Sequence, residues 1–176
     1  MLLRAPSDPL HSPAYRAGAL VLFGAVATIL VALAFEHIAG YAPCPLCLQQ
    51  RYAYNAAIPL LFLALVLLVA DRRALAGLLF LAVAAGFLAN AGLGVFHAGV
   101  EWKFWAGPDT CAATPQSLST SAGDLLKRLE NARVVRCDEA PWRLLGLSFA
   151  GWNVLTSVAL TLGAIAAAVE GLRRPV

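Results

Sequence analysis

Long apolar runs separated by short polar segments dominate the hydrophobic pattern of this sequence. Four runs are long enough to cross the hydrocarbon core of a bilayer, which needs about 20 helical residues. They cover residues 17–39, 52–70, 74–96 and 147–169, to within a few positions. The pattern therefore predicts an all-α membrane protein, in which a four-transmembrane-helix bundle forms a single integral domain over residues 1–176.

Composition agrees with this prediction. The chain is 60% hydrophobic and only 13% charged, and its mean hydropathy is +0.73. The first run is too long for the apolar core of a secretory signal, which has about 7–15 residues, so we expect an uncleaved span. The sequence contains no charge run, repeat or low-complexity tract, and this argues against nucleic-acid binding and against a solenoid.

Arginines near the span ends predict the orientation, because basic residues in short flanks resist translocation. Six of them lie in the leader, the second connection and the tail, so both termini are predicted to be cytoplasmic. The first connection, about residues 40–51, has no basic residue before Arg51. The third, about residues 97–146, balances six basic against six acidic residues, and both are predicted to lie outside. The six arginines are Arg4, Arg16, Arg72, Arg73, Arg173 and Arg174.

Aromatic rings gather where the spans meet this outer face, as amphipathic rings do at the headgroup level. We expect them to mark the membrane interface. They are Tyr41, Tyr52, Tyr54, Trp102, Phe104 and Trp105.

The third connection is too long to be an idle connector. Within it Leu125, Leu126, Leu129 and Ala132 fall on one helical face, which predicts a short amphipathic helix in this loop. The helix can pack on the top of the bundle, lie in the membrane surface or touch a partner.

All four cysteines lie in the predicted outer loops. Cys44 and Cys47 belong to the first loop, and Cys111 and Cys137 belong to the third. An even number of cysteines on an oxidising face is typical of disulfides, which can be static braces or exchangeable pairs.

The Cys44-Pro45-Leu46-Cys47 segment favours exchange. Pro45 suits a first helical turn, and a helix amino end stabilises the nucleophilic thiolate. A two-residue spacer also closes a very small ring, so the bridge gains little as a brace. Leu48 stands where haem attachment needs histidine, and Cys111 and Cys137 are too far apart in sequence for a typical four-thiolate zinc site. We predict no metal.

Exchangeable pairs relay electrons but cannot store them repeatedly, so a terminal acceptor is required. The sequence has no flavin, nicotinamide, haem or iron–sulfur motif, and a lipid-soluble acceptor fits a membrane protein. Arg51 and His97 are the candidates for holding a quinone carbonyl or the reduced oxyanion. The alternatives are that Arg51 snorkels and that His97 caps its helix. Glu36 and His37 are weaker candidates for proton handling or helix packing.

Several segments together resemble the bacterial disulfide bond formation protein B family, DsbB. They are the pair Glu36-His37 and the strings PCPLCLQQRY (residues 43–52), GVFH (94–97), VRCDE (135–139) and LGLS (145–148). The resemblance extends from the first predicted span to the fourth.

The resemblance implies a quinone-dependent thiol-disulfide oxidoreductase of the bacterial inner membrane that supports disulfide formation in exported proteins. It would reoxidise a DsbA-like periplasmic thioredoxin-fold protein and pass the electrons to ubiquinone or menaquinone. The reduced partner would attack Cys111 and free Cys137, which then engages Cys44. Cys47 would face the quinone, with Arg51 and His97 beside it.

Three other interpretations stay open at the level of sequence. A vitamin K epoxide reductase type of oxidase shares the chemistry, but in that family the loop pair precedes the quinone-side C-x-x-C. A non-enzymatic scaffold would use both disulfides as braces. A specialised paralogue would serve one dedicated dithiol partner.

Overall fold

The computed structural model describes residue 10, residues 12–108 and residues 136–173. Its helices are α1 (Pro13–His37), α2 (Pro45–Val69), α3 (Arg73–Glu101) and α5 (Phe149–Leu172). Each is long and apolar enough to cross a membrane, so the predicted four-span fold is confirmed. The expected amphipathic loop helix and Cys111 lie outside the described residues.

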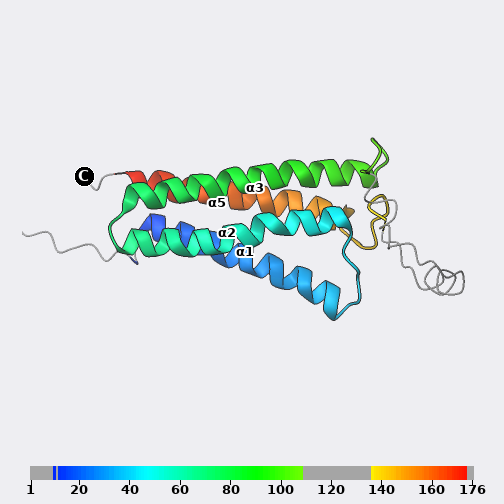
Figure 1. Cartoon of the computed structure of the whole chain (residues 1–176), viewed down its shortest axis with the longest axis horizontal. Helices are drawn as coiled ribbons and strands as arrows, with labels where there is room; N and C mark the ends of the chain where they lie inside the picture. The colour runs from blue at the N-terminus through cyan, green and yellow to red at the C-terminus, as the bar shows by residue number, and fades with distance from the viewer. Residues whose placement is uncertain (1–9, 11, 109–135, 174–176) are drawn as a thin grey trace, which may run out of the picture.

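The four helices form one elongated bundle (Figure 1). α3 packs against α2 and α5, and α1 packs against α2 and α5, so that α2 and α5 lie on a diagonal. Small residues let the helices approach closely, as is usual in membranes. At Gly18 an added Cβ would lie 2.7 Å from the ring of Phe80.

Two helices extend beyond their apolar runs toward the predicted outer end. α2 begins at Pro45 because Cys44 caps it: the Cys44 Sγ accepts a hydrogen bond from the Cys47 N–H at 3.1 Å. α3 continues to Glu101, so His97 lies in its last turns rather than in a loop. The ends of these two helices thus bring the cysteine pair and His97 to one end of the bundle.

A short antiparallel hairpin leads the chain into α5. It consists of β1 (Arg143–Leu144) and β2 (Leu147–Ser148). Leu145 and Gly146 form the turn with φ of 53° and 83°, the left-handed pair that a two-residue hairpin loop needs. The Ser148 hydroxyl then caps α5 by accepting the Gly151 N–H at 3.3 Å.

A polar network lies inside the bundle between α2, α3 and α5. The Tyr54 hydroxyl donates to Asn153 Oδ1 at 2.7 Å, and Asn90 Nδ2 donates to Ser157 Oγ at 3.0 Å. Tyr54 is only 2% exposed. The expectation that it marks the interface is therefore wrong, because its face of α2 points to the core, where its hydroxyl finds partners.

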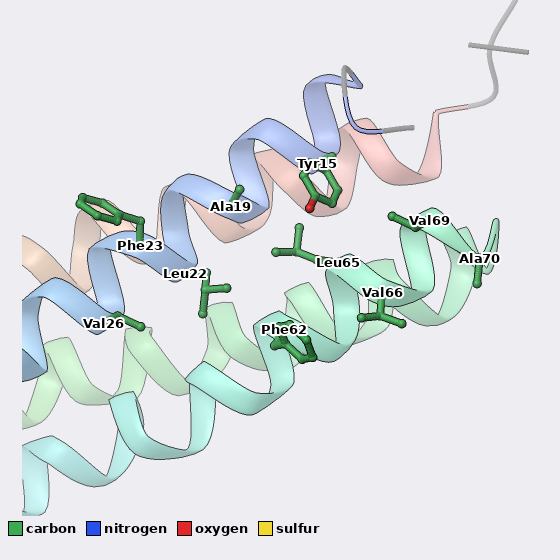
Figure 2. A pocket seen from close by; sticks show the side chains of 10 residues that line it. All are labelled: Tyr15, Ala19, Leu22, Phe23, Val26, Phe62, Leu65, Val66, Val69 and Ala70. Atoms are coloured by element: carbon green, nitrogen blue, oxygen red, sulfur yellow. The ribbon is translucent and has the colours of Figure 1, made fainter. Parts of the chain in front are cut away.

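A groove of about 670 Å³ opens between α1 and α2 (Figure 2). It lies toward the end of the bundle that holds the α2–α3 turn. Apart from the Tyr15 hydroxyl its lining is aliphatic or aromatic, so it offers little to hold a polar group. The Cys44–Cys47 pair, His97 and Glu101 lie at the opposite end.

Candidate active site

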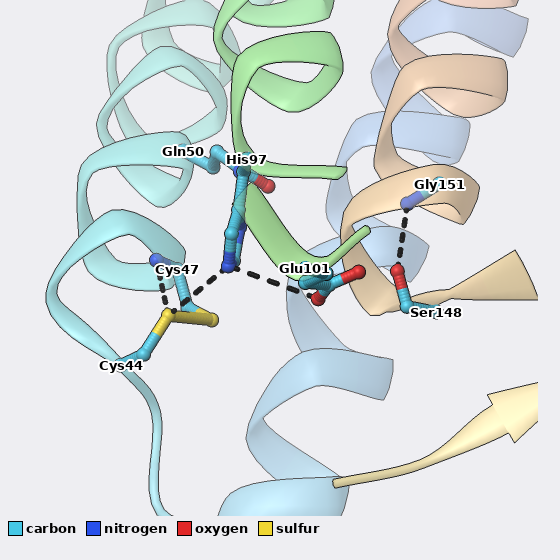
Figure 3. The surroundings of a disulfide bond; sticks show 7 residues. All are labelled: Cys44, Cys47, Gln50, His97, Glu101, Ser148 and Gly151. Carbon is cyan, nitrogen blue, oxygen red and sulfur yellow. Dashed lines mark hydrogen bonds and ion pairs between the residues drawn. A yellow bond between two sulfur atoms is a disulfide. The ribbon is translucent and has the colours of Figure 1, made fainter. Parts of the chain in front are cut away.

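The cysteine pair of the C-x-x-C segment forms a disulfide at the amino end of α2 (Figure 3). The Cα atoms of Cys44 and Cys47 are 5.0 Å apart. Cys44 is buried, whereas Cys47 is only half-buried. The two sulfurs therefore differ in access, and Cys47 is the one closer to the outside of the bundle.

Cys137, from the third connection, packs directly on this pair. It is 1% exposed and belongs to a small buried cluster with Cys44, Leu46 and Val100. It is disulfide-bonded, and its main chain is also a hydrogen-bond partner of His97. The structure thus brings Cys137 of the long loop to the C-x-x-C pair.

His97 is buried beside the disulfide. Its Nε2 lies 3.6 Å from the Cys44 Sγ, and its Nδ1 lies 2.9 Å from the side-chain nitrogen of Gln50. Because an amide nitrogen only donates, Nδ1 accepts this bond and the neutral ring carries its hydrogen on Nε2. The hydrogen bond from Gln50 thereby selects the tautomer of His97 in which Nε2, the nitrogen that faces the sulfur, carries the hydrogen.

Glu101 lies one helical turn beyond His97 and is also buried. Its Oε1 is 3.8 Å from His97 Nε2, and its Oε2 has no hydrogen-bond partner among the described residues. The Ser148 hydroxyl approaches the carboxyl group from the start of α5, and Arg143 on β1 contributes a positive charge nearby. A carboxyl group thus faces the same nitrogen of His97 that faces Cys44.

Arg51 and Glu36 form an ion pair between α2 and the end of α1. Both side chains are largely buried, with 19% and 25% of their surface exposed. Arg51 follows Cys47 by one turn, so its guanidinium lies near the depth of the disulfide. His37, the last residue of α1, is exposed.

A second charged group holds the chain next to Cys137. Asp138 accepts hydrogen bonds from Lys103, just after α3, and from Arg136. These bonds, above all the one from Lys103, lower the pKa of Asp138 to about 2. The pKa of Arg136 is raised in turn, mainly by its hydrogen bond to Asp138. Cys137 is thereby anchored by its neighbours on both sides.

Among the described residues, Cys44, Cys47 and His97 form the one close group of three potential metal-binding side chains. The two sulfurs are joined to each other in the disulfide. The group is therefore a redox centre in this state and offers no thiolate to a metal.

Sequence reasoning missed Gln50 and Glu101. Gln50 stands between the C-x-x-C pair and Arg51, and its six-residue offset from Cys44 gave no reason to place it against His97. Glu101 lies beyond the apolar run that ends near residue 96 and counted only as a loop charge. The spacing of four residues from His97 was the available signal, because such residues share a helix face.

Fold and site together indicate the class: a membrane thiol-disulfide oxidoreductase whose disulfide-bonded cysteine pair lies at the start of a transmembrane helix. Residues 15–167 match the family model described as "Disulfide bond formation protein DsbB". The chain belongs to this family, as the resemblance in the sequence predicted.

Curated relatives agree with the family model. Proteins named "Disulfide bond formation protein B" from Verminephrobacter eiseniae and Aromatoleum aromaticum are 31% and 32% identical to the chain. The alignments cover 88% and 85% of this chain and 86% and 88% of the relatives. A protein of the same name from Xanthomonas oryzae pv. oryzae is 31% identical over 90% of this chain and 93% of its own. No solved structure gives a significant match.

Membership in the family identifies the chain as a disulfide oxidase that acts in disulfide bond formation. It also identifies a multi-pass membrane protein, in agreement with the four apolar helices.

Proposed function

We propose that this protein reoxidises a periplasmic DsbA-like dithiol protein and passes the electrons to the membrane quinone pool, either ubiquinone or menaquinone. The observation that carries the proposal is the burial of Cys137 against Cys44, beside His97. A static brace has no need to pack one disulfide sulfur against a second cysteine pair. A relay does need it, because exchange passes through a mixed disulfide between the two.

The relay consists of successive thiol–disulfide exchanges. A thiolate of the reduced partner attacks Cys111, and Cys137 leaves with the electron pair. Cys137 then attacks Cys44, and the Cys44–Cys47 bond breaks so that Cys47 becomes the thiolate. The helix amino end stabilises this thiolate through its unpaired N–H groups. The second thiolate of the partner then displaces Cys111, which re-forms its bond with Cys137 and releases Cys44. Two electrons of the partner dithiol thereby reach the C-x-x-C pair.

The residues near Cys47 suit a quinone. A bound quinone supplies an acceptor for two electrons and two protons. Arg51 has five N–H donors and gives one nitrogen to Glu36, so other donors stay available for a carbonyl or an oxyanion. Both ring nitrogens of His97 already face protein groups. A direct contact of His97 with the quinone stays a prediction.

We further propose that the cysteine end faces the periplasm and that the protein lies in the bacterial inner membrane with both termini in the cytoplasm. The described arginines of the opposite end support this orientation. They are Arg16 at the start of α1, Arg72 and Arg73 at the α2–α3 turn, and Arg173 after α5.

One assay tests both ends of the relay. The purified protein is given a reduced thioredoxin-fold partner and soluble ubiquinone and menaquinone analogues, and quinone absorbance is followed for the wild type and for Cys44→Ala. The wild type should reduce quinone at the expense of partner thiols, and Cys44→Ala should not. If the wild type consumes neither quinone and all four cysteines stay unreactive, the disulfides are braces and the proposal is wrong.

A further inference from the structure

Four side chains with metal-binding atoms meet at the cysteine end of the bundle. The Cys44 Sγ, the Cys47 Sγ and one ring nitrogen of His97 lie within 4.8 Å of one another. Glu101 faces the same ring, and its Oε1 lies 3.8 Å from His97 Nε2 (Figure 3). Two sulfurs, an imidazole nitrogen and a carboxylate oxygen are all ligands that zinc accepts, provided that the sulfurs are reduced to thiolates.

The distances around His97 already approach those of a tetrahedral zinc site. Zinc lies about 2.3 Å from sulfur and about 2.0–2.2 Å from nitrogen or oxygen, so the ligand atoms of a tetrahedron are about 3.4–3.8 Å apart. His97 Nε2 lies 3.6 Å from the Cys44 Sγ and 3.8 Å from the Glu101 Oε1. The Cα atoms of Cys44 and Cys47 are 5.0 Å apart. Side-chain rotation can therefore separate the two sulfurs once their bond is broken, without movement of the backbone.

Glu101 is independent evidence that a cation fits this place. Its side chain is only 3% exposed, and its Oε2 has no hydrogen-bond partner among the described residues. Arg143 contributes a positive charge nearby, but it is exposed, so water screens it. Reduction of the disulfide adds two sulfurs that the helix amino end stabilises as thiolates. Several buried negative groups are unfavourable together unless a cation neutralises them, and a divalent cation would bind all of them at once.

Gln50 can support metal binding by His97 as well as the tautomer of the oxidised state. A metal on Nε2 requires the hydrogen of the neutral ring to lie on Nδ1. Gln50 lies 2.9 Å from Nδ1, and a half-turn of its amide replaces the donating nitrogen with the accepting oxygen. Histidine ligands commonly donate their second nitrogen to such an acceptor, which fixes the orientation of the ring. Gln50 is therefore a positioning residue for the site.

We propose that the reduced cysteine pair, Cys44 and Cys47, forms a tetrahedral Zn²⁺ site together with His97 and Glu101. The site requires reduction, because the disulfide offers no thiolate. Zinc keeps its oxidation state on binding, no electron moves, and the thiol protons pass to the solvent. Cys47 is only half-buried, which leaves a path of entry.

A consequence for the oxidase follows from this site. Sulfurs that hold a metal cannot join each other, so bound Zn²⁺ keeps the pair reduced and stops turnover until the metal leaves. The inference goes beyond the proposed function, since binding of Zn²⁺ to the reduced pair requires neither the partner protein nor a quinone.

Two alternatives compete with this ligand set. The two thiols alone can hold an adventitious metal, and Cys137, which packs against Cys44, can take the place of Glu101 as a ligand. The double variant Cys111→Ser/Cys137→Ser tests the second alternative. It removes the loop thiols and leaves Cys44 and Cys47 as the only cysteines of the chain.

The test measures metal binding by the full-length protein in detergent. The protein is reduced, freed of reductant without oxygen and titrated with Co²⁺, whose absorption reports thiolate ligands and tetrahedral geometry. Zn²⁺ then displaces Co²⁺ and gives the zinc affinity. We expect the reduced wild type and the reduced double variant to bind one Co²⁺ per chain with equal affinity, and the oxidised protein to bind none. X-ray absorption of the zinc form should show two sulfur ligands and two nitrogen or oxygen ligands, one of them an imidazole.

Further variants assign the remaining ligands. His97→Ala should lower the Zn²⁺ affinity more than about 100-fold, and Glu101→Gln and Gln50→Leu should each lower it about tenfold to 100-fold. Glutamine keeps the size of Glu101 and an oxygen that can accept from the Ser148 hydroxyl, so its effect reports metal binding and not packing. Glu139→Gln is the control and should match the wild type, because Glu139 is an exposed acid of the same end, outside the disulfide cluster.

The inference is wrong if the reduced wild type shows no thiolate-to-cobalt absorption, or if His97→Ala and Glu101→Gln both bind Zn²⁺ as tightly as the wild type. A third sulfur in the X-ray absorption of the wild type would also overturn it and would assign Cys137 as a ligand. If a variant cannot be purified folded, the ligand shell of the wild type decides alone, and a shell without an imidazole refutes the site.

The quinone assay separates this inference from the proposed function. Zn²⁺ should inhibit quinone reduction by the wild type, and a chelator should restore the rate. Undiminished turnover at Zn²⁺ concentrations that saturate the reduced protein would contradict the inference. If the wild type reduces no quinone even without Zn²⁺, the proposed function fails, and the metal titration still decides the inference.

Discussion

Arg51 on α2 is held by Glu36, which lies at the end of α1 and 15 positions earlier in the sequence. The pair joins two helices close to the disulfide and orients a guanidinium that would otherwise be free to turn toward water. Such a preorganised, partly buried cation is a suitable partner for charge that develops on a reduced acceptor.

Replacing Arg51 tests this role. Arg51→Ala should raise the KM for the quinone analogue about tenfold to a hundredfold, because a hydrogen bond from a charged group is lost. The exchange between Cys137 and Cys44 should not change. Steady-state kinetics and quenched labelling measure the two effects. Arg16→Ala, an exposed arginine at the other end, serves as the control. An unchanged quinone KM would exclude Arg51 as a quinone ligand.

Asp138 is the group whose titration should not matter near neutral pH. The pKa of Asp138 is about 2 in the folded protein, whereas its ordinary value is 3.8. The stabilisation of the folded protein by the contacts of Asp138 with Lys103 and Arg136 is therefore present above about pH 3.8 and is lost as the pH falls through 2. Asp138→Asn should slow the exchange of Cys137 with Cys44 by at most about fivefold, as expected for an exposed pair. The factor should be equal at pH 5 and pH 8, to within about twofold. A factor that grows only at the higher pH would mean that Asp138 titrates near neutrality.

The polar network in the bundle should contribute to stability. Asn90 donates to Ser157 and to Asn153, so Asn90→Ala removes bonds that link α3 to α5. We expect the free energy of unfolding in detergent to fall by about 1 kcal/mol, within the range known for interhelical polar contacts. Leu88→Ala, on the exposed face of α3, is the control. Equal stability of the two variants would mean that the network adds nothing.

The sequence predicted the four helices and the cysteine pair because both leave local signals. Apolar runs of span length mark the helices, and Cys44-Pro45-Leu46-Cys47 marks a helix start. The sequence did not predict the burial of Tyr54. Lipid-facing and core-facing positions of a membrane helix are both apolar, so the hydrophobic periodicity that would separate them is weak. Nor did the sequence place Gln50 against His97, because that contact depends on how α2 and α3 pack and spans 47 positions.

The disulfide, His97, Glu101 and Arg51 all lie at the same end of the bundle. This position has an electrical consequence. In the proposed relay, neither electrons nor protons need to travel along the helices to the opposite leaflet. Moving one charge through a full membrane potential involves about 2.3 kcal/mol per 100 mV, and the proposed relay avoids that work. Turnover should therefore be insensitive to an imposed voltage, and the long helices serve as an anchor that holds the exchange centre at the level of a diffusing lipid carrier.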